Sequence, residues 1–185
     1  MTGEYYLRGV METASGFKVN PDSTFEFFLS YGALDRYGSG KWTVKDNEII
    51  FNSAKKHGQD FELISSRKTN DNSITIKITE KNEMLQSHVY CMLKPGDDKD
   101  GMMTNKSGEA KLSFKKADSV SLIFEFVPER ISTFPLTSKK HNYFEFKFQP
   151  WIFEVYFENF SLNITDEGLT GGHPLMDGNN FKYEK

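Results

Sequence analysis

Residues 144–148 read FEFKF, so that Phe144, Phe146 and Phe148 alternate with Glu145 and Lys147. Because successive side chains of a β-strand point to opposite faces, this alternation gives one apolar face and one charged face. A strand of this kind is half buried, as in an antiparallel sheet. The same period of two recurs at residues 25–31, 74–79, 89–93, 120–126 and 160–164. The sequence therefore predicts an all-β protein built of antiparallel strands.

Short polar segments separate these runs and predict the turns between strands. They are residues 20–23, 37–40, 45–47, 69–72 and 165–168. No segment has a sustained helical period, and the best short helical candidate is residues 80–87. The charged segment 80–83 interrupts the strand pattern, which predicts a boundary between two units there. After the turn at 165–168, Phe181 and Tyr183 share a face, and we expect the chain to end as a short strand docked on a sheet edge.

Motifs in the N-terminal half have counterparts in a known family. They are GEYY at residues 3–6, NPDSTF at 20–25, GKW at 40–42 and DNEI at 46–49. They resemble the Gly-x-Trp opening, the Asp-Gly-Thr-Phe turn and the Gly-x-Trp strand of small bacterial lipocalin-like (calycin) domains. Tyr5 replaces the first Trp of that pattern, and Ser23 replaces the Gly of the turn. The stretch 11–36 also resembles bacterial all-β proteins of this length, from which no function carries over.

The C-terminal half contains TNKSGEA at residues 104–110. This segment is similar to the Thr-x-x-x-Gly-x-Ala hairpin of transthyretin-like, carboxypeptidase-regulatory-type sandwich modules, which are typically non-catalytic. The two resemblances imply an antiparallel meander or partial lipocalin-like barrel at residues 1–86, packed with a β-sandwich-like unit at 87–185. Fold alone does not give function.

Composition and charge exclude some partners. The 185 residues carry 23 Lys and Arg against 26 Asp and Glu, a net charge of −3 that is evenly spread. No half is basic enough to follow a phosphate backbone, so we expect no nucleic-acid partner. The chain opens without a basic and apolar leader, and its apolar runs are far shorter than the about 20 residues that span a bilayer. We therefore expect a cytoplasmic protein with no membrane partner.

Residues that could hold a metal are scattered. The four histidines, His57, His88, His141 and His173, form no His-x-His pair, and the single cysteine excludes a Cys-x-x-Cys motif. Residues 96–107 resemble a calcium loop, with Asp98 and Asp100 at ligand positions. However, Gly96 occupies the first position of that loop and Ser107 the last, where a bidentate carboxylate is needed. We expect no metal and no cofactor.

Motifs for nucleophilic or phosphate chemistry are also incomplete. The segment GSGK at 38–41 lacks the P-loop glycine at position 35, which is Asp35, and the Ser or Thr at position 42, which is Trp42. No Gly-x-Ser-x-Gly elbow occurs. Cys91 lies on an apolar stripe, which favours a buried small hydrophobe over a reactive thiolate. The sequence predicts no catalytic residue.

Charged residues near the ends of the first strands are the candidates for ligand binding. Arg8 and Glu12 share a face with Tyr6 on the first strand, and Arg36 follows a strong strand. Charges at such positions commonly pair with neighbours or cap turns. The functional alternative is that Tyr6, Arg8, Glu12 and Arg36 line a pocket and orient a small ligand.

Aromatic residues are densest between 143 and 160, where they make up nine of the eighteen residues. One face of each strand there is expected to be core. In the second strand, Ile152, Glu154, Tyr156 and Glu158 would share a mixed face, which is either a second packed layer, a partner surface or a platform for stacking sugars. The residues predicted to be buried are Phe25, Phe27, Leu29, Trp42, Phe124, Phe126, Phe144, Phe146, Phe153 and Leu162.

Three functions remain open. The leading hypothesis is a non-enzymatic binding or interaction module, with a small ligand or a protein as its partner. The second is a carrier of a small hydrophobic or amphipathic ligand inside the N-terminal barrel, which requires an enclosed cavity. The third is an enzyme whose site forms only in the fold, for example with His141 or His173 beside Asp35 or Glu129.

Overall fold

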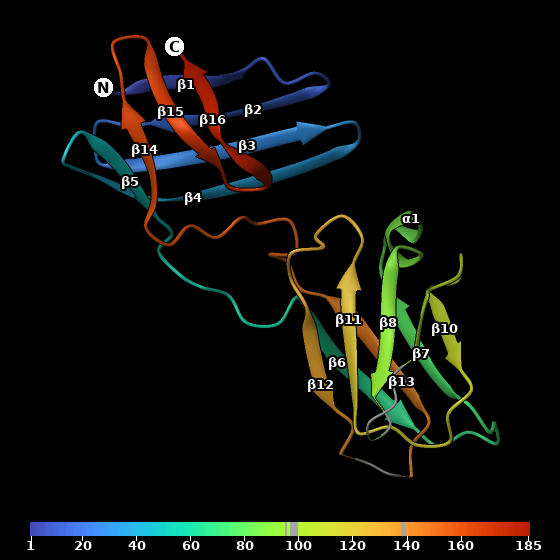
Figure 1. Ribbon diagram of the computed structural model, residues 1–185. Coiled ribbons are helices and arrows are strands. Elements are labelled where there is room, and N and C mark those ends of the chain that lie inside the picture. Colours follow the sequence, from blue (N-terminus) through green and yellow to red (C-terminus); the bar gives the residue numbers. More distant parts are fainter. Residues whose placement is uncertain (95, 97–99, 138–139) are drawn as a thin grey trace. The chain divides into compact units, whose positions relative to one another are not determined.

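The computed structural model describes residues 1–94, 96, 100–137 and 140–185, and these form two compact units. Unit 1 comprises residues 1–56 and 153–185, and unit 2 comprises residues 57–152. Almost all regular structure in the described residues is β-strand, which confirms the predicted all-β class (Figure 1). No helix in the described part of the chain is long and apolar enough to cross a membrane.

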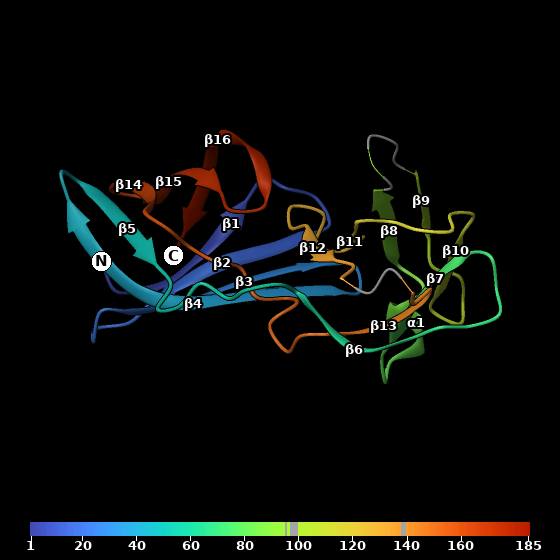
Figure 2. The same cartoon turned by 90° about the horizontal axis from the view of Figure 1, so that it is seen from below.

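Unit 1 is a closed eight-stranded antiparallel barrel. Its order is β1-β16-β15-β14-β5-β4-β3-β2. Neighbours in the barrel are neighbours along the chain except at β5 and β14, between which unit 2 is inserted, and at β1 and β16, which close the barrel. Both ends of the chain belong to this barrel, where β1 pairs with β16 (Figures 1 and 2). The strands are β1 (Gly3–Arg8), β2 (Thr13–Val19), β3 (Thr24–Tyr31), β4 (Leu34–Lys45), β5 (Glu48–Asn52), β14 (Phe160–Ile164), β15 (Gly168–His173) and β16 (Met176–Glu184).

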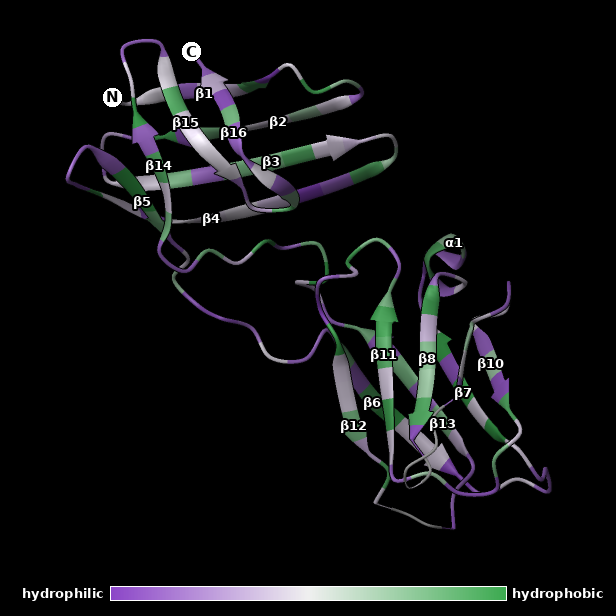
Figure 3. Cartoon of the chain, in the orientation of Figure 1, coloured by the Kyte–Doolittle hydropathy of each residue, from purple (hydrophilic) through white to green (hydrophobic). Residues whose placement is uncertain are grey.

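Unit 2 consists of two four-stranded sheets, ordered β10-β7-β13-β6 and β12-β11-β8-β9. Their apolar faces meet through Phe124 against Phe148 and Phe134 against Phe146, with ring centroids 4.8 and 5.0 Å apart. Figure 3 shows the alternation of hydrophobic and polar residues along these strands. The elements are β6 (Phe61–Arg67), β7 (Ile74–Thr79), α1 (Glu83–Gln86), β8 (Val89–Lys94), β9 (Asp100–Met103), β10 (Glu109–Leu112), β11 (Ser119–Phe124), β12 (Ser132–Pro135) and β13 (Tyr143–Phe148).

The compact units differ from the predicted division into residues 1–86 and 87–185. The first five barrel strands come from the N-terminal segment, but the barrel closes only when β14 pairs with β5 and β16 pairs with β1. The charged segment at 80–83 that suggested a boundary instead leads into α1, a single helical turn inside unit 2 whose N-cap is Asn82. A local interruption of the strand pattern therefore marks a change of element rather than a change of unit.

The C-terminal segment has a larger role than the predicted edge strand. Strand β16 closes the barrel between β1 and β15, and Tyr183 is fully buried. The register shifts between Gly171 and His173, as expected for a bulge next to paired glycines. Removal of this strand would open the barrel.

Four of the five predicted turns lie between strands, and one is wrong. Residues 37–40 lie within β4, where Gly38 faces the barrel interior. A Cβ on Gly38 would lie 2.6 Å from the Phe157 ring and 2.8 Å from the Val155 carbonyl oxygen. The glycine is therefore needed for close packing in a strand. In the sequence, a glycine with this role looks the same as a glycine that marks a turn.

Gly38→Ala is expected to destabilise the barrel by about 1–3 kcal/mol, because the added methyl group overpacks the Phe157 ring. Urea denaturation followed by circular dichroism measures this loss of stability. Gly58→Ala is the matched control, since nothing lies within 4 Å of a Cβ built there. Equal midpoints for the two variants would contradict the close packing at Gly38.

Most residues predicted to be buried lie in the two cores. Seven of the ten are buried, and Trp42, Phe126 and Phe153 are partly buried. The predicted second strand, with Ile152, Glu154, Tyr156 and Glu158 on one face, is wrong, because this segment carries only an isolated bridge between Glu154 and Tyr37. It leads the chain back to the barrel and buries Val155 and Phe157, which are members of the barrel core.

Candidate functional site

The barrel interior is filled by aromatic rings around Phe17. Its ring centroid lies 4.6–6.5 Å from six others. These belong to Phe25, Phe27, Phe51, Phe157, Phe160 and Tyr183. These rings therefore occupy the space in which a lipocalin-like barrel would hold a ligand. They come from β2, β3, β5, β14 and β16, and Phe157 comes from the segment that leads into β14.

Beside these rings the interior holds the buried polar residues Ser15 and His173. Leu175 N–H donates to His173 Nδ1 at 3.1 Å, so the imidazole proton lies on Nε2. Nε2 is 3.1 Å from Ser15 Oγ, which itself donates to the Phe28 carbonyl at 2.8 Å. His173 thus donates to Ser15 instead of accepting its proton. Burial lowers the pKa of His173 to about 4, so the ring is neutral at pH 7.

The four predicted ligand-binding residues do not converge. Tyr6 and Arg8 share the outer face of β1, where Arg8 Nε lies 3.2 Å from the Glu184 carboxylate. Glu12 lies in the β1–β2 turn with φ 58°. Arg36 points inward, is 3% exposed, and donates from Nε to the Phe153 carbonyl at 3.1 Å. Of the four, Tyr6 is the one that lines a pocket described below.

The remaining candidates for chemistry lie apart. His57 stacks on Trp151, His88 contacts Glu125, and His141 bonds to Ser66. Within the described ranges, no group of three or more His, Cys, Asp or Glu could hold a metal ion. Asp98, part of the acidic segment similar to a calcium loop, lies outside the residues that the structure describes. Cys91 is fully buried, and desolvation raises its pKa to about 12, so the thiol is protonated at neutral pH.

A pocket of about 420 Å³ lies on the outer wall of the barrel, across β1 to β4. We call it the wall pocket. The strand register aligns Tyr6, Gly16, Phe28 and Tyr37 in one row across these four strands. The next row aligns Glu4, Lys18 and Glu26. The lining residues are Glu4, Tyr6, Phe17, Lys18, Glu26, Phe27, Phe28 and Tyr37.

The rings of the wall pocket are partly exposed and partly held in place. Tyr6, Phe28 and Tyr37 are 40%, 37% and 50% exposed. The Tyr6 and Phe28 rings meet edge to face at 6.2 Å over Gly16, where a Cβ would lie only 3.0 Å from the Phe28 ring. Tyr6 donates its hydroxyl proton to Glu4 at 2.6 Å, and this carboxylate raises the pKa of Tyr6. The Tyr6 ring is therefore fixed at both its edge and its hydroxyl.

Charged groups flank the aromatic row. Lys18 Nζ lies 3.9 Å from Glu26 Oε1, a loose and exposed pair. Sequence alternation contained a signal for this site, because Phe28 falls in the polar phase of a strand whose Phe25, Phe27 and Leu29 face inward. Tyr37 was hidden by the erroneous turn prediction at residues 37–40.

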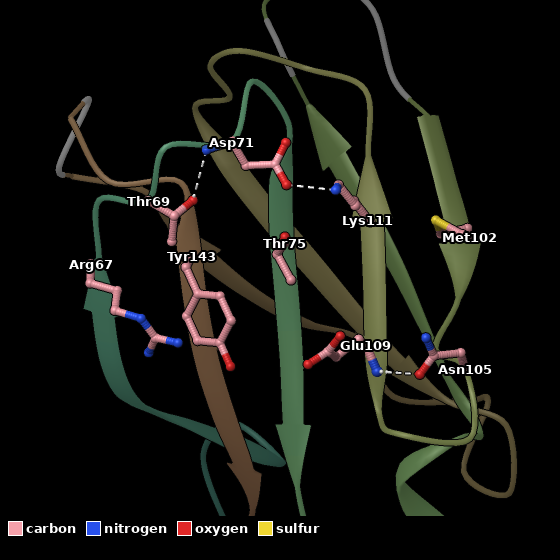
Figure 4. Close-up of a pocket in the computed structure, with 9 residues that line it drawn as sticks. All are labelled: Arg67, Thr69, Asp71, Thr75, Met102, Asn105, Glu109, Lys111 and Tyr143. Atoms are coloured by element: carbon pink, nitrogen blue, oxygen red, sulfur yellow. Dashed lines mark hydrogen bonds and ion pairs between the residues drawn. The ribbon is translucent and has the colours of Figure 1, made fainter.

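A second pocket, of about 570 Å³, lies in unit 2 on the outward face of the sheet β10-β7-β13-β6. Figure 4 shows its lining, with Arg67 beside Tyr143 and Lys111 joined to Asp71. We call it the sheet pocket. Its residues are Arg67, Thr69, Asp71, Thr75, Met102, Asn105, Glu109, Lys111 and Tyr143.

Comparison with known proteins gives no relative. No family model, no curated protein and no solved structure matches this chain. Function must therefore be argued from the geometry of the sites themselves.

Proposed function

We propose that this chain is a non-enzymatic binding module whose barrel binds a small neutral saccharide in the wall pocket. The observation that carries the proposal is the row of Tyr6, Phe28 and Tyr37, three half-exposed rings that strand register aligns on one outward face. Large exposed aromatic side chains are uncommon on a sheet surface, and their clustering marks a site of interaction.

The two rows of the wall pocket match the two kinds of surface on a sugar. Aromatic rings offer apolar faces and edges against which the C–H face of a pyranose packs. The Glu4 and Glu26 carboxylates accept hydrogen bonds from hydroxyl groups, and Lys18 donates them. Both kinds of group line the same pocket.

The size of the surface favours a small ligand over a protein partner. Aromatic side chains present about 150–250 Å² each, so exposed fractions of 37–50% amount to roughly 250 Å² for the three rings. A stable protein interface buries about 800 Å² on each partner.

The two other hypotheses have less support. A carrier would need space inside the barrel, where Phe17 and its neighbouring rings lie. An enzyme would need an activated group, whereas His173 donates to Ser15 and the Cys91 thiol is protonated.

The proposal is tested by titrating isotope-labelled protein with neutral disaccharides such as cellobiose, maltose and lactose, followed by NMR. We expect saturable shifts for at least one sugar. Phe28→Ala and Tyr37→Ala should each weaken its binding about tenfold or more, through loss of a stacking ring. Tyr31→Ala is the matched control, because Tyr31 is a 55% exposed ring of the same strand β3 that does not line the pocket. The proposal fails if no sugar binds, or if the Tyr31 and Tyr37 variants behave alike.

A further inference from the structure

Two adjacent rows of outward-facing side chains contribute to the sheet pocket of unit 2, the second of them through Glu109. Register aligns Arg67, Tyr143, Thr75 and Lys111 across β6, β13, β7 and β10. The adjacent row aligns Ser65, Glu145, Lys77 and Glu109 across the same strands. The pocket therefore has a guanidinium at one end, an ammonium at the other, and two hydroxyl-bearing residues between them (Figure 4).

The carboxylates of this face already have partners. Asp71 Oδ2 lies 2.5 Å from Lys111 Nζ, and this contact lowers the pKa of Asp71. Glu109 Oε1 lies 3.9 Å from Lys77 Nζ.

Glu145, in the second row, accepts hydrogen bonds from Thr79 at 2.7 Å and Ser65 at 2.9 Å. These two hydroxyl groups are the main cause of its lowered pKa. Asp71, Glu109 and Glu145 thus each have a closer partner than Arg67, whose positive charge is a smaller cause of the lowered pKa of Glu145.

Arg67 is the cation of the sheet pocket that forms no close ion pair within the part of the chain that the structure describes. Within residues 1–94, 96, 100–137 and 140–185, no carboxylate lies within ion-pair distance of its guanidinium. Its Cζ lies 3.5 Å from the centroid of the Tyr143 ring, so cation–π contact holds the group against the sheet. Figure 4 shows the Arg67 side chain extending toward the Tyr143 ring. Stacking in this way occupies a face of the guanidinium, and the N–H donors at its edge have no hydrogen-bond partner among the residues that the structure describes.

We infer that the sheet pocket binds a small molecule bearing a carboxylate, with Arg67 as the group that recognises it. The planar fork of arginine N–H donors matches the two oxygens of a carboxylate, and such charge-assisted pairs are stronger than neutral hydrogen bonds. A single negative charge fits better than a dianionic phosphate, because Asp71 and Glu109 also line the pocket and repel added charge. Thr75 and Tyr143 can bond the ligand's polar body, and Met102 contacts its apolar part.

The volume of about 570 Å³ lies within the range of ordinary small-molecule sites. This inference concerns unit 2 and is independent of the saccharide proposed for the wall pocket. Either can fail while the other holds.

The test compares carboxylates with neutral partners of the same shape by NMR of the labelled chain. Acetate is paired with acetamide, benzoate with benzamide, and D-glucuronate with D-glucose, while glucose 6-phosphate tests the dianion. We expect saturable shifts of the Arg67 side-chain N–H and of the Thr75 and Tyr143 amides with carboxylates, weakening as salt is added. The neutral partners should bind at least about tenfold more weakly.

Variants separate recognition by Arg67 from general attraction of anions. Arg67→Ala should abolish the shifts, and Arg67→Lys, which keeps the charge but loses the fork, should weaken binding about tenfold. Arg8→Ala is the matched control, because Arg8 is an exposed arginine of the barrel. The inference is overturned if no carboxylate binds, if neutral partners or glucose 6-phosphate bind as well as carboxylates, or if Arg67→Ala retains binding.

Discussion

Phe17→Ala is expected to lower the free energy of unfolding of the barrel by about 3–5 kcal/mol, a large share of the about 5–15 kcal/mol that stabilises a typical domain. Phe17 is 1% exposed and contacts six other rings, so its loss leaves a cavity at the centre of the core. The neighbouring rings come from separate strands and cannot all move inward to fill it. Urea denaturation measures the effect.

Phe28→Ala is the control for this variant, because it removes the same side chain from the outer face of the next strand. Its cost should be well below that of Phe17→Ala. If the two variants unfold at the same denaturant concentration, the barrel is not filled around Phe17, and the carrier hypothesis would regain its cavity.

Stability of the barrel is expected to rise between about pH 4 and pH 6.5 because of His173. Its pKa is about 4 when folded, below the ordinary value of 6.5, since burial penalises the charged ring. Between these values the unfolded chain binds a proton that the folded chain does not, so acid favours unfolding. The contribution is full above pH 6.5 and is lost as the pH falls toward 4, by about 3 kcal/mol in total.

The measurement is the difference in unfolding free energy between wild type and His173→Gln across this range. Taking the difference cancels titrations elsewhere in the chain, and glutamine keeps an N–H donor for Ser15 without a titrating ring. We expect the wild type to lose stability relative to the variant as the pH falls. Parallel curves would show that the pKa of His173 is the same in the folded barrel as in the unfolded chain, which would contradict this prediction.

Local sequence patterns predicted the strands but not their partners. The alternation at 144–148 correctly indicates that one face of β13 is buried, because side chains two residues apart in a strand point to the same face. Closure of the barrel depends on Phe160 pairing with Phe51 and on Tyr183 pairing with Leu7. In both pairs, all residues of unit 2 lie between the two partners along the chain. No local signal encodes such pairing, and for this reason the compact units divide the chain elsewhere than at residue 86.

The candidate site was predicted only in part for the same reason. Tyr6 was identified from its own strand, but Phe28 and Tyr37 join it through the register of β2, β3 and β4. Arg36 was grouped with Tyr6, although it shares the inward phase of β4 with Gly38. Its phase could have been assigned from the sequence once residues 37–40 were recognised as strand rather than turn.

Residue-by-residue NMR mapping of a bound disaccharide tests the central claim most directly. The account predicts shifts centred on Tyr6, Lys18, Phe28 and Tyr37, with Phe25 and Phe51, core residues that do not line the wall pocket, affected least. Shifts centred on Phe51 and the other rings of the core would instead indicate a ligand inside the barrel. That result would contradict the wall pocket as the binding site.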